Sequence, residues 1–204
     1  MARNEGFTLI EVTVLVAAIG ILVGLFASSA GGLLTEARVL RTRDEVEEIG
    51  TAIASFYADN GFFPRTEDVI NGRPGTEIVG VLISDAPLAG STEAGSWWVE
   101  SRLDLMAAHL STNVRGYTSR SPVSRRGWHG PYLAESIRED AWGHAYLVNV
   151  FYLDPRPVVQ EIDGTPLGAV FVLSAGPNGV IETPYYQPRT DAALYGDDIG
   201  MRLQ

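Results

Sequence analysis

The chain opens with a long apolar run, and a one-sided hydrophobic pattern continues it. No charged side chain occurs in residues 12–35, and roughly 20 apolar helical residues span the hydrocarbon core of a bilayer. The next apolar residues recur at spacings of three and four on one helical face: Val46, Ile49, Ile53 and Phe56. We therefore predict one helix from Phe7 to about Tyr57, apolar all round over 7–35 and amphipathic over 36–58.

A folded domain is expected to follow the helix, over residues 59–204. Asp59-Asn60-Gly61 predicts the helix end, with Asn or Gly available for the left-handed cap. Two runs rich in Val, Phe and Tyr, 145–153 and 169–173, predict strands. Asn178-Gly179 predicts a hairpin turn after the second run.

Residues 65–127 carry weaker patterns. Their Gly and Pro residues predict loops, and the apolar spacing over 98–110 predicts a short helix. Together these elements predict an α+β fold, in which a long N-terminal helix packs against a small C-terminal antiparallel β-sheet domain.

Composition excludes several classes of protein. The net charge of −10 argues against nonspecific nucleic-acid binding, and the absence of Cys excludes disulfides and Cys-ligated zinc. His109, His129 and His144 show no metal-ligand spacing. The sequence also has no Gly-x-Ser-x-Gly elbow and no phosphate loop. We therefore expect a protein that is not an enzyme.

Glu11 stands at the head of the apolar run, where a simple membrane anchor has no use for a carboxylate. Three interpretations compete: a signal anchor, a signal peptide cleaved after the small residues 28–30, and a short leader cut before Phe7. A signal peptide has no reason to place an acid between Arg3 and its apolar core, and its helix would not continue past Thr35. The third interpretation fits best.

The segment from Gly6 to Glu11 (GFTLIE), followed by an apolar helix, resembles the class III leader of type IV pilins and type II secretion pseudopilins. The resemblance implies that a prepilin peptidase cuts after Gly6 and N-methylates Phe7. It also implies that Glu11 neutralises the N-terminal ammonium of a neighbouring subunit in a filament. These families usually carry a helix-kinking proline where this chain has Ser28, and Gly31-Gly32 is the expected flexible point instead.

Four later motifs are similar to the type II secretion major pseudopilin. They are GPYL at 130–133, DAWGHAY at 140–146, SAGPNG at 174–179 and DDI at 197–199. The resemblance covers roughly 5–64 and 127–199, leaves 65–127 as a variable insertion, and implies a pilin-like fold.

In that family the last two motifs hold a structural calcium ion. Carried over, the ligands are the backbone carbonyl of Ala175, the side chain of Asn178, and Asp197 and Asp198. Oxygen ligands suit calcium. Asn178 replaces the usual Asp, and the stretch that follows it is longer than in the family. The alternative is a hairpin turn with a solvated acidic tail.

The resemblance implies a single-pass inner-membrane subunit with a cytoplasmic N-terminus and a periplasmic domain, and Arg3 ahead of the apolar run agrees with this orientation. Leader cleavage at residues 1–6 would precede assembly into a helical homopolymer, the pseudopilus. The implied partners are further copies of the chain, minor pseudopilins, the prepilin peptidase, and a membrane platform with its ATPase.

Two other functions remain open. One is a type IV pilus subunit for adhesion, motility or DNA uptake, and the other is a signal-anchored secreted domain. A basic patch with nearby aromatic rings agrees with nucleic-acid contact. The negative net charge of the chain favours instead a solvated loop or contacts to acidic neighbours in a filament. The patch consists of Arg115, Arg120, Arg125 and Arg126, near Tyr117 and Trp128.

Overall fold

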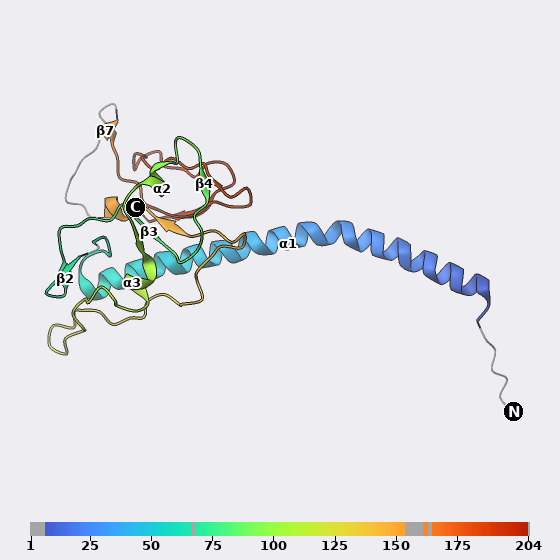
Figure 1. The fold of residues 1–204 in the computed structure, drawn as a ribbon, viewed down its shortest axis with the longest axis horizontal. Coiled ribbons are helices and arrows are strands. Elements are labelled where there is room, and N and C mark those ends of the chain that lie inside the picture. The colour runs from blue at the N-terminus through green and yellow to red at the C-terminus, as the bar shows by residue number, and fades with distance from the viewer. Residues whose placement is uncertain (1–6, 67, 154–160, 163–164, 204) are drawn as a thin grey trace. The chain divides into compact units, whose positions relative to one another are not determined.

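The computed structural model describes residues 7–66, 68–153, 161–162 and 165–203, which divide into two compact units between Arg38 and Val39. The chain is α+β, with a long N-terminal helix and a small β-sheet (Figure 1).

Helix α1 (Leu9–Asn60) has 52 residues and continues without interruption through Gly31 and Gly32. The predicted helix is therefore confirmed to within about three residues at each end. Gly61 has a φ of +78° and its N–H donates to the Tyr57 carbonyl at 2.7 Å, so it forms the expected left-handed cap.

The second half of α1 belongs to the core of the folded domain, as the hydrophobic pattern predicted. Four side chains on one face are at most 1% exposed: Val46, Ile49, Ile53 and Phe56. The ring of Phe56 lies 4.9 Å from that of Tyr117 and 5.6 Å from that of Tyr132, in edge-to-face geometry. Helix and domain are thus joined by an aromatic cluster at the helix end.

The central sheet has five strands in the order β11-β9-β6-β3-β5. Their bounds are β3 (Val81–Ile83), β5 (Leu103–Leu105), β6 (Leu147–Val148), β9 (Phe171–Ser174) and β11 (Ile199–Arg202). Strands β3 and β5 are parallel and the other pairs are antiparallel. The expected antiparallel pairing is therefore correct for three of the four strand pairs of this sheet and wrong for β3 with β5. Both parallel strands come from 65–127, so this region is part of the sheet as well as of the loops.

Three further pairs of strands are separate from this sheet. Strand β1 (Val69–Ile70) pairs with β2 (Arg73–Pro74), and β7 (Glu161–Ile162) pairs with β8 (Thr165–Pro166), both antiparallel. Strand β4 (Gly90–Ser91) pairs with β10 (Val180–Ile181) in parallel. The short helices are α2 (Trp97–Glu100), α3 (Met106–Leu110) and the 3-10 helix η1 (Val150–Leu153).

Three local predictions are wrong. The helix expected over 98–110 is divided into α2 and α3, because 103–105 extend to pair with β3. The strand expected over 145–153 is shorter, because β6 ends at Val148 and η1 begins at Val150. Residues 176–179 do form a turn, but β9 and β10 do not pair across it, since β10 pairs with β4 instead.

Candidate functional site

The first half of α1 exposes apolar side chains on every side. Within the described residues, this helix is the one segment long and apolar enough to cross a membrane, and a signal sequence near the N-terminus would pass the same test. Phe7 is 86% exposed and Leu9 is 87% exposed. Apolar side chains exposed over this length are typical of a segment that contacts lipid or other protein.

Glu11 forms a capping box with Thr8 at the start of the helix. The Thr8 backbone N–H and hydroxyl both donate to Glu11 Oε2 at 2.8 Å, and the Glu11 N–H donates to the Thr8 hydroxyl at 3.3 Å. This reciprocal pairing satisfies donors that a helix N-terminus leaves without partners. The Thr-x-x-Glu spacing in the sequence is the local signal for this capping box. Only a neighbouring subunit was expected from the sequence as the partner of Glu11. Gly6 lies outside the described residues.

Three acidic side chains brace the segment between β10 and β11. The Asp198 carboxylate accepts hydrogen bonds from the backbone N–H groups of Glu182 and Thr183, at 3.0 and 2.6 Å. The Glu182 carboxylate accepts one from the Asp197 N–H at 3.1 Å. Burial raises the pKa of the Asp198 carboxyl above its usual 3.8 in spite of these hydrogen bonds. The long stretch 179–196 is therefore closed at its two ends by carboxylates.

The turn at Asn178 joins the same cluster. Its backbone N–H donates to Asp197 Oδ2 at 3.0 Å, and its side-chain nitrogen donates to Glu182 Oε2 at 3.2 Å. Its side-chain oxygen accepts the Val180 N–H at 2.7 Å and closes the turn locally. Gly176 has a φ of +64°, and a Cβ there would lie 2.1 Å from the Asp197 carbonyl oxygen. A glycine at this position lets the two segments touch.

The structure thus brings Asn178, Asp197 and Asp198 together, and Ala175 is fully buried at the start of the same turn. Glu182 was not among the expected ligands. It lies in the stretch that departs from the family pattern, where no motif indicated its path. The available signal was an acid directly after the apolar pair that forms β10.

Two oxygens of this cluster suit a cation. Oδ1 of Asp197 and Oδ1 of Asp198 are buried and accept no hydrogen bond from any described residue. Buried oxygens without donors are costly, and a hard cation that takes six to eight oxygen ligands would satisfy them. No three His, Cys, Asp or Glu side chains in the described part form a metal-binding group. A cation here would therefore take its remaining ligands from amide, backbone or water oxygens.

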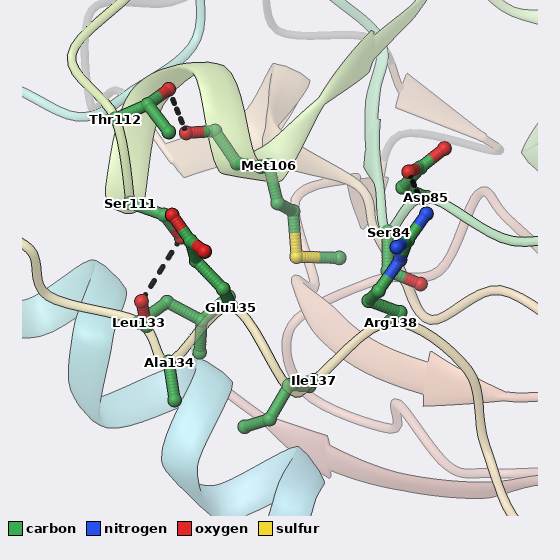
Figure 2. Close-up of a pocket in the computed structure, with 11 residues that line it drawn as sticks. Ser84, Asp85, Met106, Ser111, Thr112, Leu133, Ala134, Glu135, Ile137 and Arg138 are labelled. Atoms are coloured by element: carbon green, nitrogen blue, oxygen red, sulfur yellow. Dashed lines mark hydrogen bonds and ion pairs between the residues drawn. The ribbon is translucent and has the colours of Figure 1, made fainter.

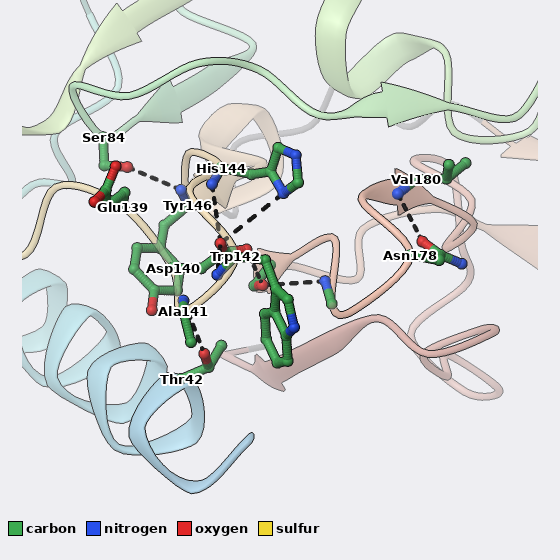
Figure 3. Close-up of polar contacts among 12 residues, drawn as sticks. Thr42, Ser84, Glu139, Asp140, Ala141, Trp142, His144, Tyr146, Asn178 and Val180 are labelled. Atoms are coloured by element: carbon green, nitrogen blue, oxygen red, sulfur yellow. Dashed lines mark hydrogen bonds and ion pairs between the residues drawn. The ribbon is translucent and has the colours of Figure 1, made fainter. Parts of the chain in front are cut away.

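A buried carboxylate organises the DAWGHAY motif (Figure 3). Asp140 accepts the backbone N–H groups of Trp142 and His144 through Oδ1, both at 2.9 Å, and the Ser174 hydroxyl through Oδ2 at 2.6 Å. The Ala141 N–H donates to the Thr42 hydroxyl on α1 at 3.4 Å. The motif is a loop tied to both the helix and β9, which is a structural role.

A second buried network lies within residues 65–127, the region that was expected to be a variable insertion. His109 contacts Asp104 Oδ2 through Nε2 at 2.8 Å and the Tyr117 hydroxyl through Nδ1 at 2.6 Å, and all three residues are buried. Burial by itself would raise the pKa of Asp104, but hydrogen bonds from His109 and Arg115 outweigh it and hold this pKa below 3.8. The expected basic patch is therefore divided, because Arg115 is paired inside this network.

One hollow of about 210 Å³ lies beside α3 (Figure 2). Met106 and Ile137 supply apolar walls, and the Ser111 hydroxyl on its rim donates to the Leu133 carbonyl at 3.0 Å. It is smaller than the roughly 300–1,000 Å³ of pockets that bury small molecules.

Comparison of the chain with protein-family models, with curated proteins and with solved structures gave no significant match.

Proposed function

We propose that this protein is a leader-processed, membrane-inserted pseudopilin that polymerises into a periplasmic filament for type II protein secretion. The observation that carries the proposal is the construction of α1. Its first half exposes apolar side chains all round behind a carboxylate at Glu11, and its second half is part of a folded domain's core. Such a helix suits a subunit that is stored in lipid and then transferred into a bundle of identical helices.

The role of Glu11 in assembly is an exchange of partners. In the single chain its carboxylate is bonded to Thr8 at the helix start. Cleavage after Gly6 creates a new ammonium at Phe7, and the Phe7 ammonium of a neighbouring copy would pair with Glu11 in the apolar filament interior. An ion pair in such surroundings is favourable only when both charges meet, so a subunit docked at a wrong height is penalised.

Calcium is part of the same proposal. Asp197 and Asp198 would hold it through their free oxygens, with the Asn178 side chain and the Ala175 carbonyl as further ligands. Bound calcium supplies positive charge to a cluster of carboxylates. The chain's own residues already tie the 176–179 turn to the segment before β11, so the ion would stiffen an existing contact.

The central experiment determines the mature N-terminus. Protein purified from membranes of a host with a prepilin peptidase is examined by intact mass and N-terminal sequencing. We expect a chain that begins with methylated Phe7, and an uncut precursor when Gly6 is replaced by Leu. Asn4→Ala, within the same leader, is the matched control and should be processed normally. A mature chain that begins at Ala2 or Gly31 would contradict leader cleavage after Gly6 and, with it, the proposed function.

A further inference from the structure

A polar pocket of about 260 Å³ lies at the C-terminal end of α1, and two arginines line it. Arg73 belongs to the β1–β2 hairpin and Arg126 to the basic patch, and Thr118 adds a hydroxyl to the lining. None of these residues belongs to the Glu11 or calcium sites. One of the pocket's arginines, Arg126, is a member of the basic patch, and the proposed function assigns it no role.

Backbone geometry fixes the hairpin that carries Arg73. Asn71 and Gly72 have φ values of +51° and +75°, as a two-residue hairpin turn of the primed type requires. The Thr118 N–H donates to the Gly72 carbonyl at 3.2 Å, and a Cβ on Gly72 would lie 1.7 Å from the Thr118 hydroxyl. The hairpin is thus seated directly on residue 118.

Arg126 lies beside the end of α1. Its Nη1 lies 2.3 Å from the position that a Cβ on Gly61 would take, so the glycine of the helix cap makes room for the guanidinium. The Gly127 N–H donates to the Asp59 carbonyl at 2.9 Å and anchors the loop to the last turn of α1. The C-terminal end of α1 carries a partial negative charge of about one half, which attracts the Arg126 guanidinium. This partial charge is too small to neutralise two guanidinium groups.

Neither arginine is neutralised by a neighbour in the described part of the chain. No ion pair forms between Arg73 or Arg126 and any described carboxylate. Two described acids of the flanking segments have other partners: Asp59 accepts the Tyr132 hydroxyl at 3.1 Å, and Asp68 accepts backbone N–H groups at 2.8 and 3.1 Å. Within the described residues, these two exposed, like-charged side chains therefore share one pocket without a counter-ion.

We propose that this pocket binds an oxyanion, either a carboxylate or a phosphate, between the guanidinium groups of Arg73 and Arg126. Planar guanidinium groups match the oxygen pairs of both anions, and the Thr118 hydroxyl supplies a neutral donor. A carboxylate would come from the acidic surface of a second copy, since each chain carries a net charge of −10. That source rests on the proposed polymerisation, whereas free phosphate does not.

The test uses the full chain in detergent micelles, titrated with inorganic phosphate and followed by calorimetry and tryptophan fluorescence. Arg73→Gln and Arg126→Gln should each weaken phosphate binding at least fivefold, and the double variant should abolish it. Arg120→Gln, an exposed member of the same basic patch outside the pocket, is the control and should bind like the wild type. Circular dichroism and the melting temperature show that each variant is folded.

Self-association of the same variants distinguishes the two sources. If a carboxylate of a second copy occupies the pocket, phosphate inhibits self-association of the wild type and the double variant associates at least fivefold more weakly. If phosphate binds with the expected arginine dependence but self-association is unchanged, the anion is free phosphate. The proposal is overturned if the double variant and Arg120→Gln behave alike in both assays. Wild-type protein that binds phosphate but never polymerises would contradict the pseudopilin function alone.

Discussion

The Tyr146 hydroxyl donates a hydrogen bond to the Glu45 carboxylate and so joins the start of β6 to the second half of α1. Tyr146 is fully buried, and the Glu45 side chain is only 18% exposed. The pKa of the Tyr146 hydroxyl is raised above its usual 10.0, mainly because the group is buried and secondly because the Glu45 carboxylate is adjacent. Glu45, which is not one of the four apolar residues of the helical stripe, is therefore a partner of the core.

Replacing Glu45 by Ala should lower the free energy of unfolding by about 1–3 kcal/mol, because it leaves a buried hydroxyl without its acceptor. Glu45→Gln keeps an acceptor and should cost less. Urea denaturation measures both effects. Glu48→Ala, three residues further along the same helix and exposed, is the control and should stay within about 0.5 kcal/mol of the wild type. Equal effects at the two positions would contradict a specific role for the Glu45–Tyr146 contact.

Asp140 is expected to be more important for stability than its exposed neighbour in sequence. Asp140→Ala removes the acceptor of three donors at once, two of them backbone N–H groups of the same loop, and should cost about 3 kcal/mol or more. Thermal and urea unfolding test this. Glu139→Ala, an exposed acid beside it, should have little effect. A tolerated Asp140→Ala would show that the loop keeps its shape without the carboxylate.

The stability of the C-terminal loop should depend on pH in a direction set by Asp198. Its folded pKa is raised above 3.8, so the protonated form is favoured in the folded state. The resulting stabilisation is fully present below pH 3.8 and is lost as the pH rises through the raised pKa. Melting temperatures of wild type and Asp198→Asn, measured across this range in a chelator, should differ by an amount that changes with pH.

Calcium should oppose that loss of stability. Above the raised pKa of Asp198, millimolar calcium should increase the melting temperature of the wild type, because the ion binds the folded state. Asp198→Asn should respond much less, and Asp191→Asn, an exposed acid of the same long stretch, should respond like the wild type. If calcium does not change the melting temperature of the wild type, the proposed metal site is contradicted.

Thr8 and Glu11 separate helix capping from filament assembly. Thr8→Ala removes the capping partner but leaves the carboxylate, so filaments should still form when assembly is followed by electron microscopy. Glu11→Gln keeps the side chain's shape but removes its charge, and should insert into the membrane yet assemble at least tenfold less. If both variants assemble equally well, Glu11 serves the helix cap alone.

Local rules predicted the helix well. The spacing of the apolar side chains and the glycine after Asn60 act within a few residues, and the structure follows both. The parallel pairing of β3 with β5 could not be predicted in this way. Each of these strands has three residues, too short for a period to appear, and their partners lie far apart along the chain.

The carboxylate cluster shows the same division. The motifs indicated Asn178, Asp197 and Asp198, which lie together, but Glu182 enters through contacts that span about fifteen residues of irregular chain. The pairing of Glu11 with Thr8 differs from the contacts of Glu182, because the two residues are only three positions apart. Its Thr-x-x-Glu signal could therefore be read from the sequence.

The Thr42 side chain is fully buried and its hydroxyl accepts the Ala141 N–H, so the folded domain begins within the helix and not after it. A soluble fragment for biophysical work must therefore start ahead of Thr42. A fragment that begins at Asn60, where the helix ends, would lack Val46, Ile49 and Ile53 and would leave the hydrophobic core incomplete.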